Sequence, residues 1–287
     1  MVKIAYLVLG VFACSTSVIM IKESAEQPLL LAAYRLLIAA VILSPWYFRD
    51  LKNHRGSYQA AHLGATVVPA VFLAGHFISW IIGARMTTAT NATLIVTMVP
   101  ITMPFFLFFL FREKLNRPEV LGTFLSLLGT VILTAADFRL SDENFRGDLL
   151  SFISLVLMTY YMVLARKNRS IPTIYLYLVP LYFIAGIFCL AAAVFFINPI
   201  KSYTLKDILL ILGLGIVPTV FGHSLINYCM QQLRGQIVSL ATPSQFIFAG
   251  IMAYFFFSEI PKWTFYISSI LILAGIFTAI KFKLTKD

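Results

Sequence analysis

The stretch Val217–Gln245, VPTVFGHSLINYCMQQLRGQIVSLATPSQ, predicts two apolar helices joined by a short hinge. In its first part His223, Asn227 and Gln231 recur every four residues. This spacing puts them on one stripe of a helix that is otherwise built from apolar residues. An unpaired amide or imidazole in hydrocarbon is costly, so the stripe must face other helices or a wet cavity.

The second part repeats the pattern beyond a hinge at Leu233–Gly235. Ser239, Thr242 and Gln245 are spaced by about one turn, and Pro243 removes a backbone donor among them. Two interpretations are open. The polar groups line the wall of a cavity, or they only hydrogen-bond between packed helices.

Composition identifies the class of protein. Of the 287 residues 60% are hydrophobic and 12% are charged, and the mean hydropathy is +0.89, which is typical of an all-α integral membrane protein. Apolar runs near the ~20 residues that a bilayer requires predict ten spans. They fall at 4–21, 29–48, 63–82, 89–111, 118–136, 148–165, 172–197, 207–230, 236–257 and 263–281.

The net charge of +10 would favour a nucleic-acid partner in a soluble protein, but its distribution here has another explanation. With the N-terminus inside, 14 of the 22 Lys and Arg residues fall in cytoplasmic segments and 7 in outer loops. This bias predicts that both termini lie in the cytoplasm of a bacterial cell, with lipids as neighbours and no nucleic-acid partner. The three cysteines form no disulfide or metal pattern, and no cofactor is expected.

The polar linker Asp137–Asp148 divides the chain into halves, 1–140 and 141–287. Similar residues recur in order in both halves: Gly75-His76 with Gly222-His223, Leu94 with Leu240, Glu113 with Glu259, and Gly129 with Gly275. We interpret this as an internal repeat. Five spans per half would insert the second copy upside down, an architecture of transporters with a central site between the repeats. Duplicated scaffolds and enzymes are the alternative.

Several motifs resemble a known family. VPTVFGHSLINYCMQQL followed by VSLATPSQFIFAGIMAYFFFSE, and TTATNATLIVTMVPITMPFFLFFLFREKLN followed by LGTFLSLLGTVIL, are similar to paired EamA domains of the drug/metabolite transporter superfamily. The resemblance implies ten helices in two inverted five-helix repeats. It also implies a central cavity lined by the third, fourth, eighth and ninth helices, with contributions from the first and sixth. Members similar to this chain move amino acids, nucleotide-like metabolites, sugars or carboxylates, most often outward.

Arg35 is the only charge well inside a predicted span. Burying it unpaired would cost roughly 2.5–3.5 kcal/mol at a helix centre. It either serves the structure, by snorkelling to the outer interface or pairing with a helix C-terminal carbonyl, or it attracts a carboxylate or phosphate substrate.

The span at 63–82 carries His76 and Trp80 on one face, and the repeat relates them to His223 and Asn227. Two interpretations are open: the histidines are satisfied packing residues, or they line a substrate cavity, an interpretation that the symmetry strengthens. Proton antiport through the two histidines is one hypothesis. The span at 89–111 adds hydroxyls and an amide beside prolines, which favours either a polar site or a locally repaired kink. Its candidate cavity residues are Asn91 and Thr97.

Tyr160 and Tyr161 either reach the cavity or belong to an interfacial belt. The spans at 118–136 and 263–281 carry small residues at four-residue spacing, Gly122-xxx-Ser126-xxx-Thr130 and Gly275-xxx-Ala279, which favours close helix contact.

No acidic residue lies in the middle of a span, which disfavours export of cationic drugs through a membrane-embedded glutamate. The sequence has no HExxH, GxSxG or Walker motif. We therefore interpret it as a non-enzymatic permease of a bacterial inner membrane, monomeric, that exports amino acids or related small metabolites. Transport of nucleotide-like, sugar or carboxylate metabolites is the alternative. A multi-span enzyme acting on lipids is the alternative of another class.

Overall fold

A computed structural model describes residues 2–134, 142–196, 198–199, 202–257 and 260–284, and all regular structure in these ranges is helical. The elements are α1 Val2–Ser15, α2 Ser17–Glu23, α3 Pro28–Asn53, α4 Ala60–Gly64, α5 Val67–Met86, α6 Ala89–Thr97, α7 Val99–Phe111, α8 Arg117–Thr134, α9 Asp142–Lys167, α10 Ile174–Val194, α11 Leu205–Leu214, the π-helix η1 Gly215–His223, α12 Ser224–Gln232, α13 Gly235–Ala241, the 3-10 turn η2 Thr242–Ser244, α14 Gln245–Phe257 and α15 Trp263–Leu284.

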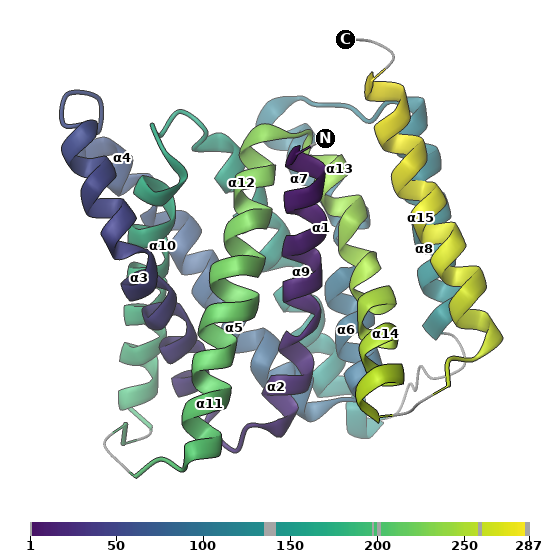
Figure 1. Ribbon diagram of the computed structural model, residues 1–287, viewed down its shortest axis with the longest axis horizontal. Coiled ribbons are helices and arrows are strands. Elements are labelled where there is room, and N and C mark those ends of the chain that lie inside the picture. Colours follow the sequence, from purple (N-terminus) through teal and green to yellow (C-terminus); the bar gives the residue numbers. More distant parts are fainter. Residues whose placement is uncertain (1, 135–141, 197, 200–201, 258–259, 285–287) are drawn as a thin grey trace.

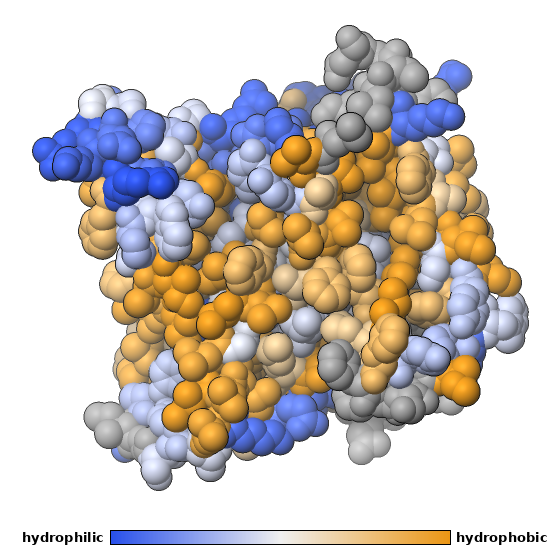
Figure 2. Space-filling view, viewed as in Figure 1, coloured by the Kyte–Doolittle hydropathy of each residue, from blue (hydrophilic) through white to orange (hydrophobic). Residues whose placement is uncertain are grey.

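Eight helical segments of the described chain are long and apolar enough to cross a membrane. Figure 2 shows the matching surface, a broad apolar band across the middle with hydrophilic side chains gathered at two opposite rims. Two of the ten predicted spans are not among the eight. The run at 118–136 is described only as α8, which begins with Arg117 and Glu119, and the run at 236–257 is interrupted by η2.

Several predicted spans are broken helices. The run at 89–111 ends one helix at Thr97 and starts another at Val99, next to Pro100. The run at 207–230 was expected to be one α-helix, but it passes through nine residues of π-helix around Pro218. Proline cannot donate the backbone hydrogen bond that a regular helix needs, which explains why the chain departs from α geometry at these places.

Three pairs of helices run along one another most closely: α3 with α10, α5 with α9, and α8 with α15. In the last pair a Cβ on Gly122 would lie 2.5 Å from the carbonyl oxygen of Gly275, so the backbones touch as the small-residue spacing predicts. Figure 1 shows α8 and α15 as a pair at the side of the bundle.

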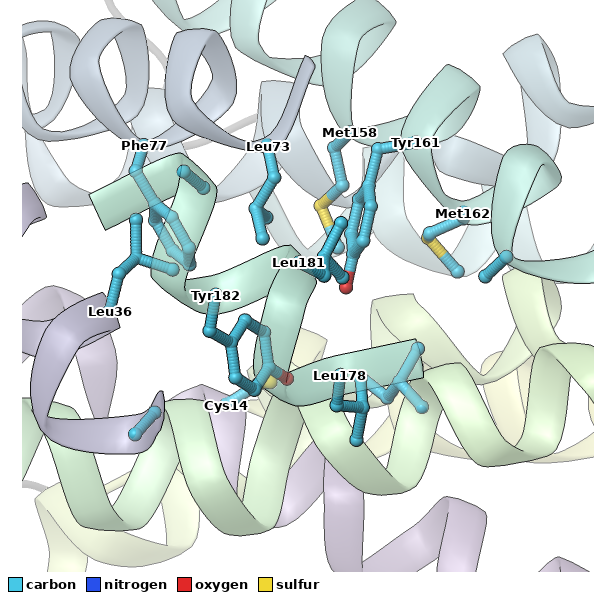
Figure 3. Packing of buried hydrophobic residues seen from close by; sticks show 14 of the residues in the cluster. Cys14, Leu36, Leu73, Phe77, Met158, Tyr161, Met162, Leu178, Leu181 and Tyr182 are labelled. Atoms are coloured by element: carbon cyan, nitrogen blue, oxygen red, sulfur yellow. The ribbon is translucent and has the colours of Figure 1, made fainter. Parts of the chain in front are cut away.

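The centre of the bundle is filled by side chains from α1, α3, α5, α9, α10 and α12, and Figure 3 shows part of this core. It contains the fully buried rings of Phe77, Tyr161 and Tyr182. The start of α1 and the end of α15 lie at the same end of the molecule (Figure 1). We call it the terminal end, and the other the distal end.

Candidate functional site

The site begins with the local structure of η1. Thr219 donates from Oγ1 to the carbonyl of Leu214 over 2.7 Å, and Ser224 donates to the carbonyl of Thr219 over 3.3 Å, both at the five-residue spacing of a π-helix. Pro218 within this segment supplies no backbone donor. Such widened turns are frequent at functional sites.

Five buried polar residues from four helical elements meet at the end of η1, and we call them the central polar cluster. They are His76 on α5, Ser154 and Tyr161 on α9, and His223 and Asn227 on η1 and α12. The rings of His76 and His223 have centroids 6.0 Å apart. The two histidines related by the sequence repeat are therefore neighbours in the fold.

Hydrogen bonds hold part of this cluster. The Ser154 hydroxyl lies 2.8 Å from Nδ1 of His76, and Asn227 donates from Nδ2 to the Tyr161 hydroxyl and, over 2.7 Å, to the carbonyl of His223. The side chains are almost fully enclosed, since His76 is 2% exposed and Asn227 1%. The cluster is closed to solvent in this conformation.

Two polar atoms of the cluster have no hydrogen-bond partner, Nδ1 of His223 and Oδ1 of Asn227. Leaving a buried polar atom unsatisfied costs about 1–3 kcal/mol. Such atoms within one cluster therefore indicate a place where a polar solute or water could bind.

Arg35 on α3 lies next to the cluster. Its guanidinium stacks over the Phe77 ring at 4.1 Å, and the same ring packs edge-on against His223 at 4.9 Å. The residue is 0% exposed, so it does not reach the outer interface as the snorkelling interpretation requires. It donates to side-chain hydroxyls, from Nε to Thr219 over 3.0 Å and from Nη1 to Ser17 over 3.3 Å.

A second predicted group, Thr97, Ser239 and Thr242, lies where the end of α6 meets η2, directly after α13. Thr242 donates to the carbonyl of Thr97 over 3.0 Å and to that of Ser239 over 2.8 Å. Gln236 joins the group by donating to the carbonyl of Pro100 over 3.2 Å. These bonds satisfy carbonyls released where the helices break, as expected for a repaired kink.

The remaining predicted site residues are dispersed. Asn91 in the first turn of α6 contacts both carboxylate oxygens of Asp148 at 3.2 Å. Trp80 is buried in the core next to the cluster on α5, while Gln245 is half-buried. Gln231 is also half-buried, and its Nε2 has no partner. These four residues are not part of the central polar cluster.

Two grooves open elsewhere on the described surface. One of about 730 Å³ lies between α3, α4, α5 and α10, and one of about 610 Å³ between α1, α3, α10 and α12. Their walls are mainly apolar, and none of the predicted cavity residues lines them.

Sequence reasoning missed Ser154, Thr219 and Tyr182. Tyr182 on α10 reaches the Ser224 hydroxyl at 3.1 Å, and Figure 3 shows it in the packed core. Isolated hydroxyls in apolar runs give no periodic signal, so only the pairing of helices could reveal them. For Tyr161 the interfacial-belt interpretation is wrong, since the ring is fully buried.

Comparison with known proteins identifies the family. Residues 1–135 and 145–280 match the model of the EamA-like transporter family. The chain belongs to this family. EamA proteins are part of the drug/metabolite transporter superfamily, so the resemblance found in the sequence is confirmed.

Relatives of this EamA protein agree with that assignment. An uncharacterized transporter of Archaeoglobus fulgidus is 25% identical over 266 residues, covering 88% of this chain and 87% of the relative. An uncharacterized transporter of Methanothermobacter thermautotrophicus is 24% identical, covering 93% of this chain and 82% of the relative. A solved crystal structure superposes with a TM-score of 0.80 at 18% identity, covering 98% of this chain and 97% of the other. The protein is thus a multi-pass membrane protein of a transporter family.

Proposed function

We propose that this protein is a secondary transporter that exports amino acids or related small metabolites across the bacterial inner membrane by alternating access. We further propose that it has ten spans in two inverted five-helix repeats, 1–140 and 141–287. Both termini would be cytoplasmic, and the working unit would be a monomer.

Contacts between α8 and α15 support the inverted repeat. Gly122 meets Gly275, and Gly129 meets the carbonyl of Ser268, to which a Cβ would lie 2.8 Å away. Gly122 and Ser268 are 146 residues apart, as are Gly129 and Gly275, so each contact maps onto the other when the repeats are exchanged. Since the residue order is reversed between the helices, the pair is antiparallel, as equivalent helices of inverted repeats must be.

The other helix pairs follow the same exchange. α3 and α10 hold equivalent places in the two halves. They run antiparallel, because Leu37 contacts Gly186 while Trp46, further along α3, stacks on Tyr175 at the start of α10. α1, in the first span, packs on η1, in the eighth span. α5, in the third span, packs on α9, in the sixth span. These two pairings exchange under a two-fold axis.

The central polar cluster is the single observation that carries the transport site. It lies between segments of both proposed repeats, it is buried, and it holds unpartnered polar atoms on His223 and Asn227. An occluded site between inverted repeats, beside a proline-interrupted helix, is what a secondary transporter requires. The proposed substrate contacts are His76, Trp80, His223, Asn227 and Gln231, and Asn91, Thr97, Ser239, Thr242 and Gln245 contribute through the fourth and ninth helices.

Counterflow in proteoliposomes tests the proposal. The purified protein is reconstituted into vesicles, and the vesicles are loaded with one unlabelled solute. The uptake of radiolabelled amino acids, carboxylates, sugars and nucleotides into these vesicles is then followed. We expect saturable exchange of an amino acid, reduced about tenfold or more in Asn227→Leu, because about 1–3 kcal/mol of hydrogen bonding is lost. Gln232→Leu, on the exposed face of the same helix, is the control and should exchange at the wild-type rate.

Other outcomes decide between the candidates. Saturable exchange of a sugar or nucleotide alone would overturn the amino-acid assignment and keep the carrier. Linear, non-saturable flux would indicate a channel. No solute exchange together with turnover of a bilayer lipid would favour the membrane enzyme.

A further inference from the structure

Arg35 is a buried cation whose neutralising anion is absent from the described residues. Its side chain is 0% exposed, and no ion pair of the described chain includes it. The described carboxylates that form ion pairs do so elsewhere: Glu23 with Lys206, Asp50 with Arg49, Glu113 with Arg166 and Arg234, and Glu119 with Arg234. An uncompensated charge inside a membrane protein is costly and is typical of a functional site.

Two nitrogens of the Arg35 guanidinium donate hydrogen bonds, and the third has no hydrogen-bond partner. Thr219 donates its own hydrogen to Leu214 and accepts from Nε of Arg35, which fixes the direction of that bond. Phe77 covers one face of the guanidinium, and Ser17 accepts from Nη1 at the long distance of 3.3 Å. Nη2 is buried and has no partner.

The free nitrogen lies at one end of a row of polar groups. Thr219, His223 and Asn227 follow one another at four-residue spacing along η1 and the first turn of α12. Arg35 is bound to the first of them, and the unpartnered Nδ1 and Oδ1 belong to the other two. A solute bound along this row would have its anionic group at Arg35 and its neutral polar groups near His223 and Asn227.

We infer that Arg35 binds a carboxylate or phosphate group of the substrate, so that the transported solute must be an anion or a zwitterion. Arginine suits both groups, since its planar nitrogens match their oxygens. This inference rests on the proposed function and narrows it, because neutral sugars and amides would lack the required group.

The test measures binding without transport. The melting temperature of the purified protein is measured with each solute at constant ionic strength, set by sodium chloride. Two pairs of solutes differ only in charge: lactate with lactamide, and succinate with succinamide. Inorganic phosphate and leucine are measured as well. A ligand at ten times its Kd should raise the melting temperature by about 2–4 °C. We expect anions, but not their amides, to stabilise the wild type. The outcome with phosphate against carboxylates distinguishes the two headgroups.

Two variants separate binding from a structural role. Arg35→Met removes the charge at similar length and should lose the anion-dependent shift, while Arg35→Lys should keep part of it. Without solute, Arg35→Met should melt at or above the wild-type temperature, because an uncompensated buried charge has been removed. Lys206→Met removes an exposed cation and should behave as wild type.

Two results would overturn the inference. The first is that every anion changes the melting temperature of the wild type and of Arg35→Met equally, or changes neither. The second is that Arg35→Met is much less stable than the wild type without solute. Counterflow distinguishes this failure from that of the proposed function. Equal exchange of lactate and lactamide would keep the carrier and reject the anion site. Anion-dependent stabilisation without exchange would keep the anion site and reject the carrier.

Discussion

Lys22 donates a hydrogen bond from Nζ to the backbone carbonyl of Thr87 over 3.1 Å, and so ties the end of α2 to the hinge between α5 and α6. Arg166 makes the equivalent bond at the terminal end, from Nη1 to the carbonyl of Leu233 over 2.9 Å. Thr87 and Leu233 are 146 residues apart, and both end their helices in extended conformation, with φ −134° and −118°. Each end of the molecule is thus closed by the same kind of contact.

The two contacts differ in the charges that support them. At the terminal end Arg166 also pairs with Glu113 at 2.7 Å, and Arg234 pairs with Glu119 at 2.5 Å. Burial alone would lower the pKa of Arg234, but its hydrogen bond to Glu119 and the nearby carboxylates raise it above its usual value. Arg234 therefore keeps its positive charge at physiological pH.

We predict that Glu119→Gln loosens the hinge at the terminal end. The amide keeps the shape of the side chain but loses the charge, and a hydrogen bond to a charged group contributes about 1.5–3 kcal/mol when well enclosed. Arg234 is 33% exposed, so solvent screening reduces this and we expect about a three- to tenfold effect. The measurement is the rate at which N-ethylmaleimide labels Cys229, one turn before Leu233, in a Cys14→Ala, Cys189→Ala background.

The exposed pair of Lys206 with Glu23 supplies the control for this experiment. Its side chains are 66% and 61% exposed, so Lys206→Met should leave the labelling rate unchanged. Equal labelling of Cys229 in wild type and Glu119→Gln would show that the ion pairs do not hold this end closed.

We predict unequal effects for two adjacent tyrosines. Tyr161 is fully buried and accepts the hydrogen bond of Asn227, whereas Tyr160 is half-buried between the rings of Phe72 and Phe106. Tyr161→Phe should lower stability by about 1–2 kcal/mol, because it leaves a buried amide short of a partner. Tyr160→Phe should change the melting temperature little. Similar shifts for both variants would contradict the assignment of Tyr161 to the cluster.

The membrane-spanning helices could be predicted because long apolar runs in a bilayer permit little else. The kinks beside Pro100 and Pro243 also followed from the sequence, since proline acts locally through its missing donor. The π-helix at Gly215–His223 did not, because its turns depend on side chains such as Thr219 that bond to carbonyls five residues away. A pattern of residue types does not determine that register.

The candidate site was partly predictable for a related reason. His76 and His223 stand out by the repeat, and the structure brings them together. Ser154 lies on a different helix, so its bond to His76 depends on how α5 and α9 pack. The sequence also could not distinguish hydroxyls that satisfy a broken backbone, such as that of Thr242, from hydroxyls that face a solute.

We predict that Gly122→Ala weakens the contact of α8 with α15. The added Cβ would lie 2.5 Å from the carbonyl oxygen of Gly275, which is backbone and cannot move without shifting the helix. Overpacking of this kind costs about 1–3 kcal/mol and should lower the melting temperature. Gly64→Ala is the control, because a Cβ there meets nothing within 4 Å. A stable Gly122→Ala protein would mean that the two helices separate at little cost.

The histidine pair leads to a prediction about energy coupling. If His76 and His223 exchange the proton during transport, the double variant His76→Gln, His223→Gln should lose flux driven by a pH gradient and keep downhill exchange, because glutamine hydrogen-bonds but does not titrate. The charged and titratable groups that face the pair are Arg35, through the Phe77 ring, and Tyr161 at 6.3 Å from His223.

The measurement compares both fluxes in proteoliposomes of the wild type, the double variant and a control, His54→Gln with His62→Gln, which changes the other two of the four histidines. Since His54 follows α3 and His62 lies in α4, away from the cluster, the control should keep both fluxes. Retained pH-driven flux in the double variant would exclude the histidines as the proton carriers and leave them as ligands of the solute.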